Sequence, residues 1–255
     1  MALFNDGPIS ATMDLQNYES GILNVASTEG IDLSGKMALA QDSIASDLML
    51  FLLRRLNVRD FQWNLRRARG TSDIVVTAPL KQWHAHKTLA MVYRDAYNNQ
   101  LNDRYLNKWN EYESLAKGSA ETYLQIGVGV VADPLPQPAI PWLSSQAVPG
   151  AAGATYYVAI TWTNSAGEES GLSDIGTITT ADGQQVLVAT ANPPANSGGW
   201  NVYAGLSPDT LSLQNGTPIG LSDNWTLTTL IQGRPAGGGQ QPTWFFVDHR
   251  VIERG

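Results

Sequence analysis

The sequence contains no cysteine, few charged residues and no long apolar run, and each absence narrows what the protein can be. Without cysteine there are no disulfides and no cysteine-based metal or redox chemistry. No stretch approaches the about 18 consecutive apolar residues of a membrane-spanning helix. Residues 1–9 carry neither the basic nor the apolar run of a signal peptide. We therefore expect a protein that folds in a cytoplasm and has no membrane partner.

Charge is scarce and unevenly distributed. Charged residues make up 15% of the chain and the formal net charge is −7, so no overall basic field points to nucleic acid. Residues 1–135 carry 13 Lys/Arg and 15 Asp/Glu, whereas residues 136–255 carry 3 and 8. A chain of 255 residues has room for two domains. The second half is therefore a charge-poor, mildly acidic part of the molecule.

Histidine is also scarce, and no motif of a catalytic or cofactor site is complete. His84 and His86 lie two apart on a predicted helix, about 200° apart around its axis, so they cannot share a metal ion. Residues 30–37 approach a phosphate-binding loop, but Met37 stands where Ser or Thr would hold magnesium. We expect no catalytic residue, no cofactor, no metal, and hence no enzyme.

The stretch from Pro79 to Gln125 predicts a single very long helix. Its apolar and aromatic residues recur in steps of four, with one step of three, which places them on one stripe of a helix about 70 Å long. The stripe predicts a bundle seam, part of which is expected to pack against neighbouring subunits. The seam residues are Tyr93, Tyr97, Leu101, Tyr105, Trp109 and Tyr112.

Beyond the helix, the pattern changes from helical to alternating. Four prolines between Pro134 and Pro141 indicate a stiff, extended connector. Short alternating segments separated by Gly, Asn, Pro and Asp then predict a β-sandwich. They include Thr155–Thr163, Ile175–Thr180, Gln185–Thr190 and Trp200–Gly205.

Two further segments are candidate interaction sites. Six of the sixteen basic residues fall within sixteen positions, and they form either a solvated face or a patch that meets DNA or an acidic portal surface. They are Arg54, Arg55, Arg59, Arg66, Arg67 and Arg69. The apolar run Trp244, Phe245, Phe246 and Val247 follows a glycine-rich spacer. It predicts a strand that returns to the helices or docks on a neighbour.

Several phrases within residues 10–135 resemble tailed-bacteriophage head-to-tail adaptor proteins, also called head completion or neck connector proteins. The phrases are 14–19, 22–33, 80–84, 93–98, 100–105, 108–109 and 125–131. The resemblance implies a helical bundle that assembles with itself as a ring, expected twelve-fold, beneath the portal protein. Such a ring extends the DNA channel, contacts packaged DNA non-specifically and docks the next neck or tail protein.

The second half departs from the shorter adaptors. Residues 185–194 and 198–203 resemble the B and C strands of fibronectin type III or Ig-like domains. Residues 156–173 resemble the closing hairpin of that fold, although they come earlier in this chain. The resemblance implies a sandwich that is either permuted or incomplete.

Together these features predict an α+β multidomain protein. We expect a helical adaptor domain over residues 1–135, a connector over 136–143, an Ig-like or FnIII-like sandwich over 144–232, and a spacer with a docking strand over 233–255. The expected function is that of a virion structural protein of the neck, assembled in the host cytoplasm. The alternative is a carbohydrate-binding module on a helical oligomerisation domain, with sugar-stacking rings from Trp142, Trp162, Trp200, Trp225 and Trp244.

Overall fold

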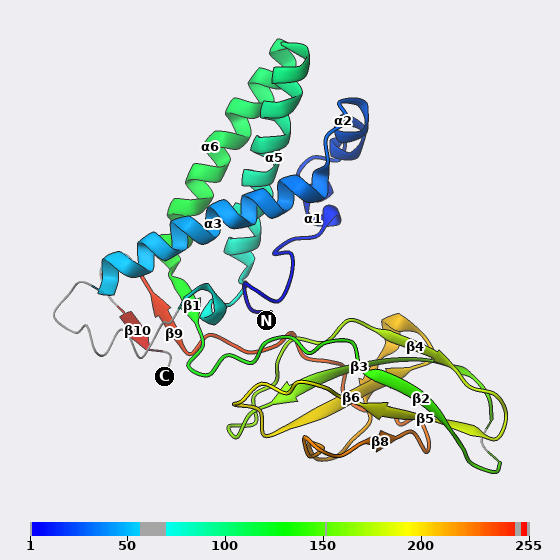
Figure 1. Cartoon of the computed structure of the whole chain (residues 1–255). Coiled ribbons are helices and arrows are strands. Elements are labelled where there is room, and N and C mark those ends of the chain that lie inside the picture. Colours follow the sequence, from blue (N-terminus) through cyan, green and yellow to red (C-terminus); the bar gives the residue numbers. More distant parts are fainter. Residues whose placement is uncertain (1, 57–69, 151, 248–250, 254–255) are drawn as a thin grey trace. The chain divides into compact units, whose positions relative to one another are not determined.

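The computed structural model describes residues 2–56, 70–150, 152–247 and 251–253 (Figure 1). The chain divides into two compact units, and each is discontinuous in sequence. The helical unit comprises Gly7–Ala132 and Pro242–Gly255, and the β-unit comprises Met1–Asp6 and Asp133–Gln241. The predicted mixed α+β class is confirmed. The first six residues, which sequence analysis assigned to the helical domain, lie in the β-unit.

The helical unit is built around one buried helix. Its described helices are α1 (Thr12–Tyr18), α2 (Ile22–Thr28), α3 (Leu33–Leu56), α5 (Ala78–Gln100) and α6 (Asp103–Ile126), with a 3₁₀ turn, η1 (Thr71–Asp73). Helix α5 contacts α1, α2, α3 and α6, and α3 runs across the α5–α6 pair (Figure 1). None of the described helices is long and apolar enough to cross a membrane.

The prediction of one very long helix is wrong, because the chain turns back at Leu101. Leu101 adopts a left-handed conformation, with φ 50° and ψ 38°. Asn102 then caps α6, and its side-chain oxygen accepts a hydrogen bond from the Arg104 amide at 3.0 Å. Asp103 adds negative charge in the first turn, where the helix dipole favours it. The stretch therefore forms an antiparallel hairpin of two helices (Figure 1).

A small antiparallel sheet completes the helical unit. It consists of β1 (Val128–Val130), β9 (Trp244–Phe246) and β10 (Val251–Glu253), in the order β1-β9-β10. Val130 pairs with Trp244, so residues far apart in sequence are direct neighbours. The segment of the β-unit from Asp133 to Gln241 is thus inserted between two paired strands of the helical unit.

The β-unit contains two antiparallel sheets. The first has the order β2-β5-β8, formed by Trp142–Ala147, Gln184–Ala189 and Trp225–Thr226. The second has the order β4-β3-β6-β7, formed by Gly176–Thr179, Thr155–Thr163, Gly199–Gly205 and Ser212–Leu213. A 3₁₀ turn, η2 (Pro208–Thr210), lies between β6 and β7.

The two sheets enclose one hydrophobic core. It contains Val158, Ile160 and Trp162 from β3, Val186 and Val188 from β5, and Trp200 and Val202 from β6. Trp200 is fully buried, and its Nε1 donates to the Gly220 carbonyl at 3.0 Å. The five tryptophans proposed as a sugar platform therefore do not share a surface. Two are core, Trp225 packs partly against the core, Trp142 is 70% exposed, and Trp244 belongs to the helical unit.

Candidate functional site

The aromatic residues of the predicted seam pack against one another between the two helices of a single hairpin, α5 and α6. The rings of Tyr93 on α5 and Tyr112 on α6 stack with centroids 5.7 Å apart and an interplanar angle of 3°. Tyr93 also contacts Tyr105, and Tyr97 contacts Trp109, each at 6.2 Å. The residues that sequence analysis placed on one stripe of one helix thus face each other across two helices.

A partly buried polar cluster connects this seam to the C-terminal end of α1. The Tyr112 hydroxyl donates to Glu19 Oε2 at 3.0 Å, and Lys108 Nζ lies 3.0 Å from the same oxygen. Burial alone would raise the pKa of Glu19, but hydrogen bonds from Lys108 and Tyr112 hold that pKa below its ordinary value. Burial raises the pKa of both Tyr93 and Tyr112, so their phenols remain donors at neutral pH. This cluster stabilises the bundle.

Leu101 does not belong to the seam. It lies at the tip of the α5–α6 hairpin, and its side chain is 72% exposed. The side chain therefore gains little from packing within its own chain. It is an apolar group presented to solvent at the end of a projecting element.

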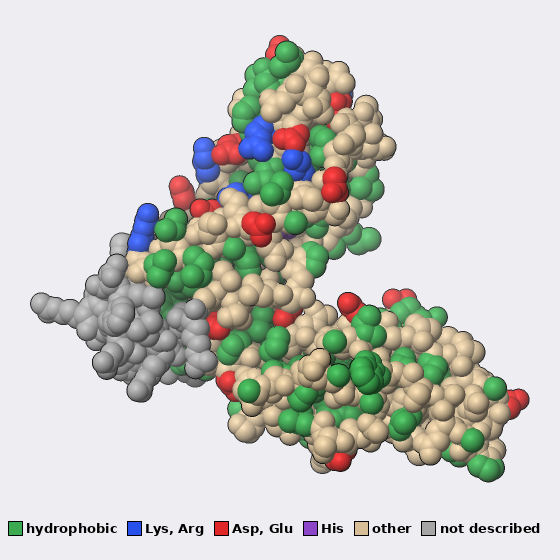
Figure 2. All heavy atoms as spheres, viewed as in Figure 1, with side chains coloured by type: hydrophobic (Ala, Val, Ile, Leu, Met, Phe, Trp, Pro, Cys, Tyr) green, Lys and Arg blue, Asp and Glu red, His purple; other side chains and the backbone are tan. Residues whose placement is uncertain are grey.

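Large apolar side chains also lie on the outside of α3 and α6. Leu39, Leu50 and Leu53 of α3 are 53%, 54% and 49% exposed, and Leu115 and Ile126 of α6 are 42% and 54% exposed. Leu50 and Leu53 are one turn apart, and Leu39 lies on the same face three turns before Leu50, so the three leucines span about 21 Å. Asp42, Ser43 and Ser46 lie on this face between Leu39 and Leu50. Leu115 and Ile126 have the same spacing as Leu39 and Leu50. Figure 2 shows hydrophobic side chains on the viewed face of α3. We call Leu39, Leu50 and Leu53 the α3 outer stripe.

The predicted arginine patch lies mostly outside the described residues. Arg54 is exposed near the C-terminal end of α3. The backbone of Arg55 is described within α3, but its side chain is not. Arg59, Arg66, Arg67 and Arg69 are not described. The patch therefore stays a prediction.

The predicted docking strand is part of the helical unit. Residues Trp244, Phe245 and Phe246 form β9, the central strand of its sheet, and Val247 follows directly. Phe246 is 1% exposed, whereas Phe245 is half-buried. Of the two alternatives left open by the sequence, the structure has the strand returning to the helices.

The two histidines of α5 have separate partners. His84 Nε2 lies 2.9 Å from the Met37 carbonyl, which can only accept, so Nδ1 accepts from the Ser10 hydroxyl at 2.5 Å. His86 Nδ1 lies 2.8 Å from Ser119 Oγ. Burial lowers the pKa of both histidines. Within the described residues, no three His, Asp or Glu side chains are placed to hold a metal ion.

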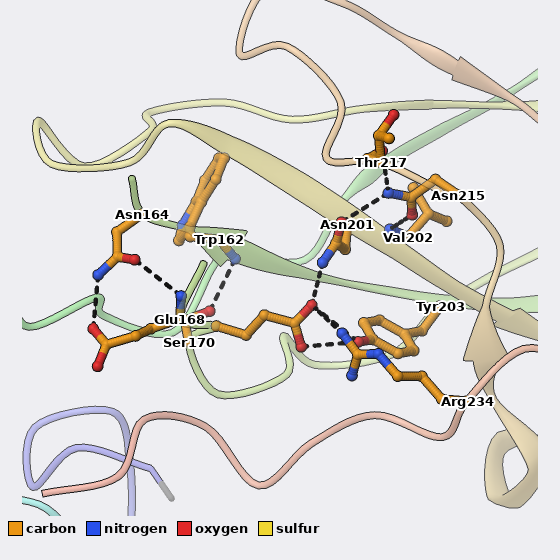
Figure 3. Close-up of polar contacts among 11 residues, drawn as sticks. Trp162, Asn164, Glu168, Ser170, Asn201, Val202, Tyr203, Asn215, Thr217 and Arg234 are labelled. Carbon is orange, nitrogen blue, oxygen red and sulfur yellow. Dashed lines mark hydrogen bonds and ion pairs between the residues drawn. The ribbon is translucent and has the colours of Figure 1, made fainter. Parts of the chain in front are cut away.

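In the β-unit, three side chains converge on one carboxylate, that of Glu169 (Figure 3). Arg234 donates from its guanidinium at 2.6 Å, Tyr203 donates from its hydroxyl at 3.0 Å, and Asn201 donates from its amide. Burial, followed by the charge of Glu169, raises the pKa of Tyr203 to about 12. A carboxylate held in this way is paired and not free to act as a base. The cluster fastens residue 234, at the start of the predicted flexible spacer, to strand β6.

Sequence analysis missed a cavity at one end of the β-unit. Its volume is about 540 Å³, and it opens between the two sheets. The lining residues come from five separate segments and include Val148, Tyr156, Gln184, Gln185, Leu206, Leu227, Thr228 and Leu230. None of the described residues that line it is charged. No local motif marks these positions, because they are brought together only by the fold.

Comparisons with known proteins add no relative. A scan against protein-family models gives no match. A search of the curated proteins finds none with significant similarity. The resemblance to adaptor proteins therefore rests on the short phrases within residues 10–135.

Proposed function

We propose that this chain is a virion structural protein, a head-to-tail adaptor that assembles with itself as a ring beneath the portal. The ring would extend the DNA channel and dock the next neck or tail protein. The adaptor-like phrases cover parts of α1, α2, α5, α6 and β1 and the residues that adjoin them, all of which belong to the helical unit. The proposal assigns no catalytic residue and no cofactor.

The observation that carries the proposal is the α3 outer stripe. The aromatic rings of the seam pack against one another within the helical hairpin. Three leucines on one face of α3 nevertheless remain about half exposed. Leu50 and Leu53 are neighbours on this face, and adjoining exposed apolar side chains are a feature of protein–protein contact surfaces. A ring requires head-to-tail contacts that close, so a second, different surface must meet this stripe. Leu115 and Ile126 on α6 supply a candidate for that second surface.

We also propose that the β-unit is an Ig-like domain with a permuted strand order. Ig-like sandwiches place strands A, B and E in one sheet, and G, F, C and C′ in the other. The sheet β2-β5-β8 matches the first set if these strands stand for A, B and E, in that order. The sheet β4-β3-β6-β7 matches the second set if its strands stand for G, F, C and C′. Trp200 on β6 would then be the buried tryptophan typical of strand C.

Light scattering of the purified chain mixed with its portal protein tests the proposed function. We expect the wild-type chain to form a large complex with the portal. Leu50→Asp combined with Leu53→Asp should abolish that complex while leaving the fold intact, because both side chains are about half exposed. Ala38→Asp is the matched control, since Ala38 is exposed on α3 but lies about 100° around the helix from Leu39. A wild-type chain that stays monomeric and never joins the portal would refute the proposal.

A further inference from the structure

The cavity at the end of the β-unit has walls that are held in place by hydrogen bonds from their backbone amides. The Val148 amide donates to the Gly183 carbonyl at 2.7 Å, and the Gly153 amide donates to Asp182 Oδ1 at 2.8 Å. On the other side, the Leu227 amide donates to the Val186 carbonyl at 2.9 Å. Both walls are thereby anchored to β5 and to the turn before it. Its volume of about 540 Å³ falls within the range of about 300–1,000 Å³ that is usual for small-molecule sites.

The lining combines an apolar floor with polar groups that lack protein partners. Leu227 is buried, and Leu230 and the Tyr156 ring pack against the core. Within the described part of the chain, the lining side chains of Tyr156, Gln185, Thr228 and Thr229 have no hydrogen-bond partner in the protein; the two threonines are exposed to solvent, and Tyr156 and Gln185 are half-buried. A ligand that both donates and accepts can therefore pair with these groups without displacing an existing contact.

The absence of charge in the lining disfavours ionic ligands. A phosphate, sulfate or carboxylate that entered would lose hydration without meeting a counter-charge. The β-unit contains a single Lys or Arg, namely Arg234, and its guanidinium is already paired with Glu169. Among the described lining residues there is no Asp or Glu whose carboxylate could receive a cation. Figure 2 likewise shows no Lys or Arg on the viewed face of the β-unit. The lining therefore favours a neutral ligand over an ionic one.

We propose that this cavity binds a neutral saccharide. The Tyr156 ring and the leucine floor suit the apolar C–H face of a sugar ring. The Gln185 amide and the Thr228 hydroxyl suit sugar hydroxyls, each of which donates and accepts. A wholly apolar ligand would leave these groups unpaired, at a cost in binding. The saccharide site does not depend on ring assembly, so the two proposals fail separately.

Binding of the labelled full-length chain to an array of neutral and anionic oligosaccharides tests the site. We expect neutral glycans among the bound members, with affinities in about the millimolar to micromolar range by titration calorimetry. Sialylated, sulfated or phosphorylated versions of the bound glycan should not bind more tightly than the neutral one when the charged group enters the cavity. Binding to no glycan, or to anionic glycans alone, would overturn the proposal.

Variants then locate the site. Gln185→Ala and Thr228→Ala should each weaken binding of the identified glycan by about three- to tenfold, the effect of one lost hydrogen bond. Tyr156→Phe keeps the ring and tests the hydroxyl without opening the core. Gln232→Ala and Thr177→Ala are matched controls, because both residues are exposed in the β-unit outside the cavity. If all three cavity variants bind as the wild type does, the site is not this cavity.

Discussion

At the scale of single residues, Leu101 carries two costs that a turn residue ordinarily avoids. Its backbone is left-handed, which is unfavourable by roughly 1–2 kcal/mol for a side chain of this kind. Its side chain is also 72% exposed, so packing within the chain does not offset that cost. A residue that is unfavourable for the fold and displayed at the tip of a hairpin is a candidate contact residue.

Replacing Leu101 by a residue that tolerates a left-handed backbone should therefore stabilise the helical unit. Leu101→Asn should raise the free energy of unfolding by up to about 1 kcal/mol, because Asn tolerates the left-handed conformation better. Thermal unfolding measures this change. Leu101→Ala is the control, since it removes the side chain but keeps the backbone cost. A destabilising Leu101→Asn would show that the leucine packs within the fold after all.

His84 makes the stability of the helical unit depend on pH. Burial lowers its pKa below the ordinary 6.5, and the Met37 hydrogen bond and the Asp14 charge offset this only in part. Below about pH 6.5 the unfolded chain binds a proton that the folded chain resists. The free energy of unfolding should therefore fall with falling pH by at most about 1.4 kcal/mol per pH unit for this group, until the folded pKa is passed.

Denaturant unfolding at several pH values between neutrality and pH 5 checks this prediction. His84→Gln should flatten the pH dependence, and the part that remains should come from groups such as His86, whose pKa is also lowered by burial. An equal slope in the wild type and in His84→Gln would contradict the assignment.

At the scale of elements, the aromatic stripe shows that the sequence pattern predicts the helical period correctly but does not reveal the turn between the two helices. The helical period on both sides of Leu101 is correct, because Tyr93 and Tyr112 both face the seam. The period continues across the turn, since two antiparallel helices that share a seam carry apolar residues of the same spacing. The end of the first helix was nevertheless signalled by Asn102 and Asp103, a cap followed by an acidic first turn.

The cavity of the β-unit could not be predicted in this way. The alternation in Thr155–Thr163 predicts a strand, and Tyr156 lies within it. The neighbours of Tyr156 in the cavity are nevertheless fixed by pairing between distant segments, such as Leu187 with Thr226. Periodicity reports which face of an element is buried, and it carries no information on where the ends of two sheets leave a gap.

Strand β9 offers a matched pair of substitutions. Phe246 is 1% exposed, so Phe246→Ala should destabilise the helical unit by about 3–5 kcal/mol, the usual cost of a buried Phe→Ala change. Phe245→Ala on the same strand should cost less, because Phe245 is only half-buried. Scanning calorimetry measures both variants. Equal effects would mean that β9 does not pack as described.

Truncation after Gly239 removes the whole strand and should destabilise the helical unit too.

At the scale of the whole molecule, the larger segment of the β-unit, Asp133–Gln241, is an insertion between β1 and β9. Val130 pairs with Trp244, and the Thr243 amide donates to the Val130 carbonyl at 2.8 Å, so the two ends of the insertion meet in the sheet. The sequence located the change of character near residue 135 through its prolines and its loss of charge. It did not reveal that the last strand returns to the helical unit.

Removal of the insertion should therefore leave a folded helical unit. Replacing residues 133–241 by Asn-Gly supplies a short turn that suits antiparallel strands. We expect cooperative thermal unfolding and retained portal binding, with loss of saccharide binding. If the shortened chain is unfolded by circular dichroism, the two units do not fold independently.

The central claim is that this chain forms a ring on the portal, and electron microscopy tests it most directly. The measurement images portal rings alone and after incubation with the purified full-length chain. We expect an added ring of density at one end of each portal, with an open channel along its axis. This density should be lost with the Leu50→Asp, Leu53→Asp variant. Portal rings that remain bare beside a monomeric wild-type chain would contradict it.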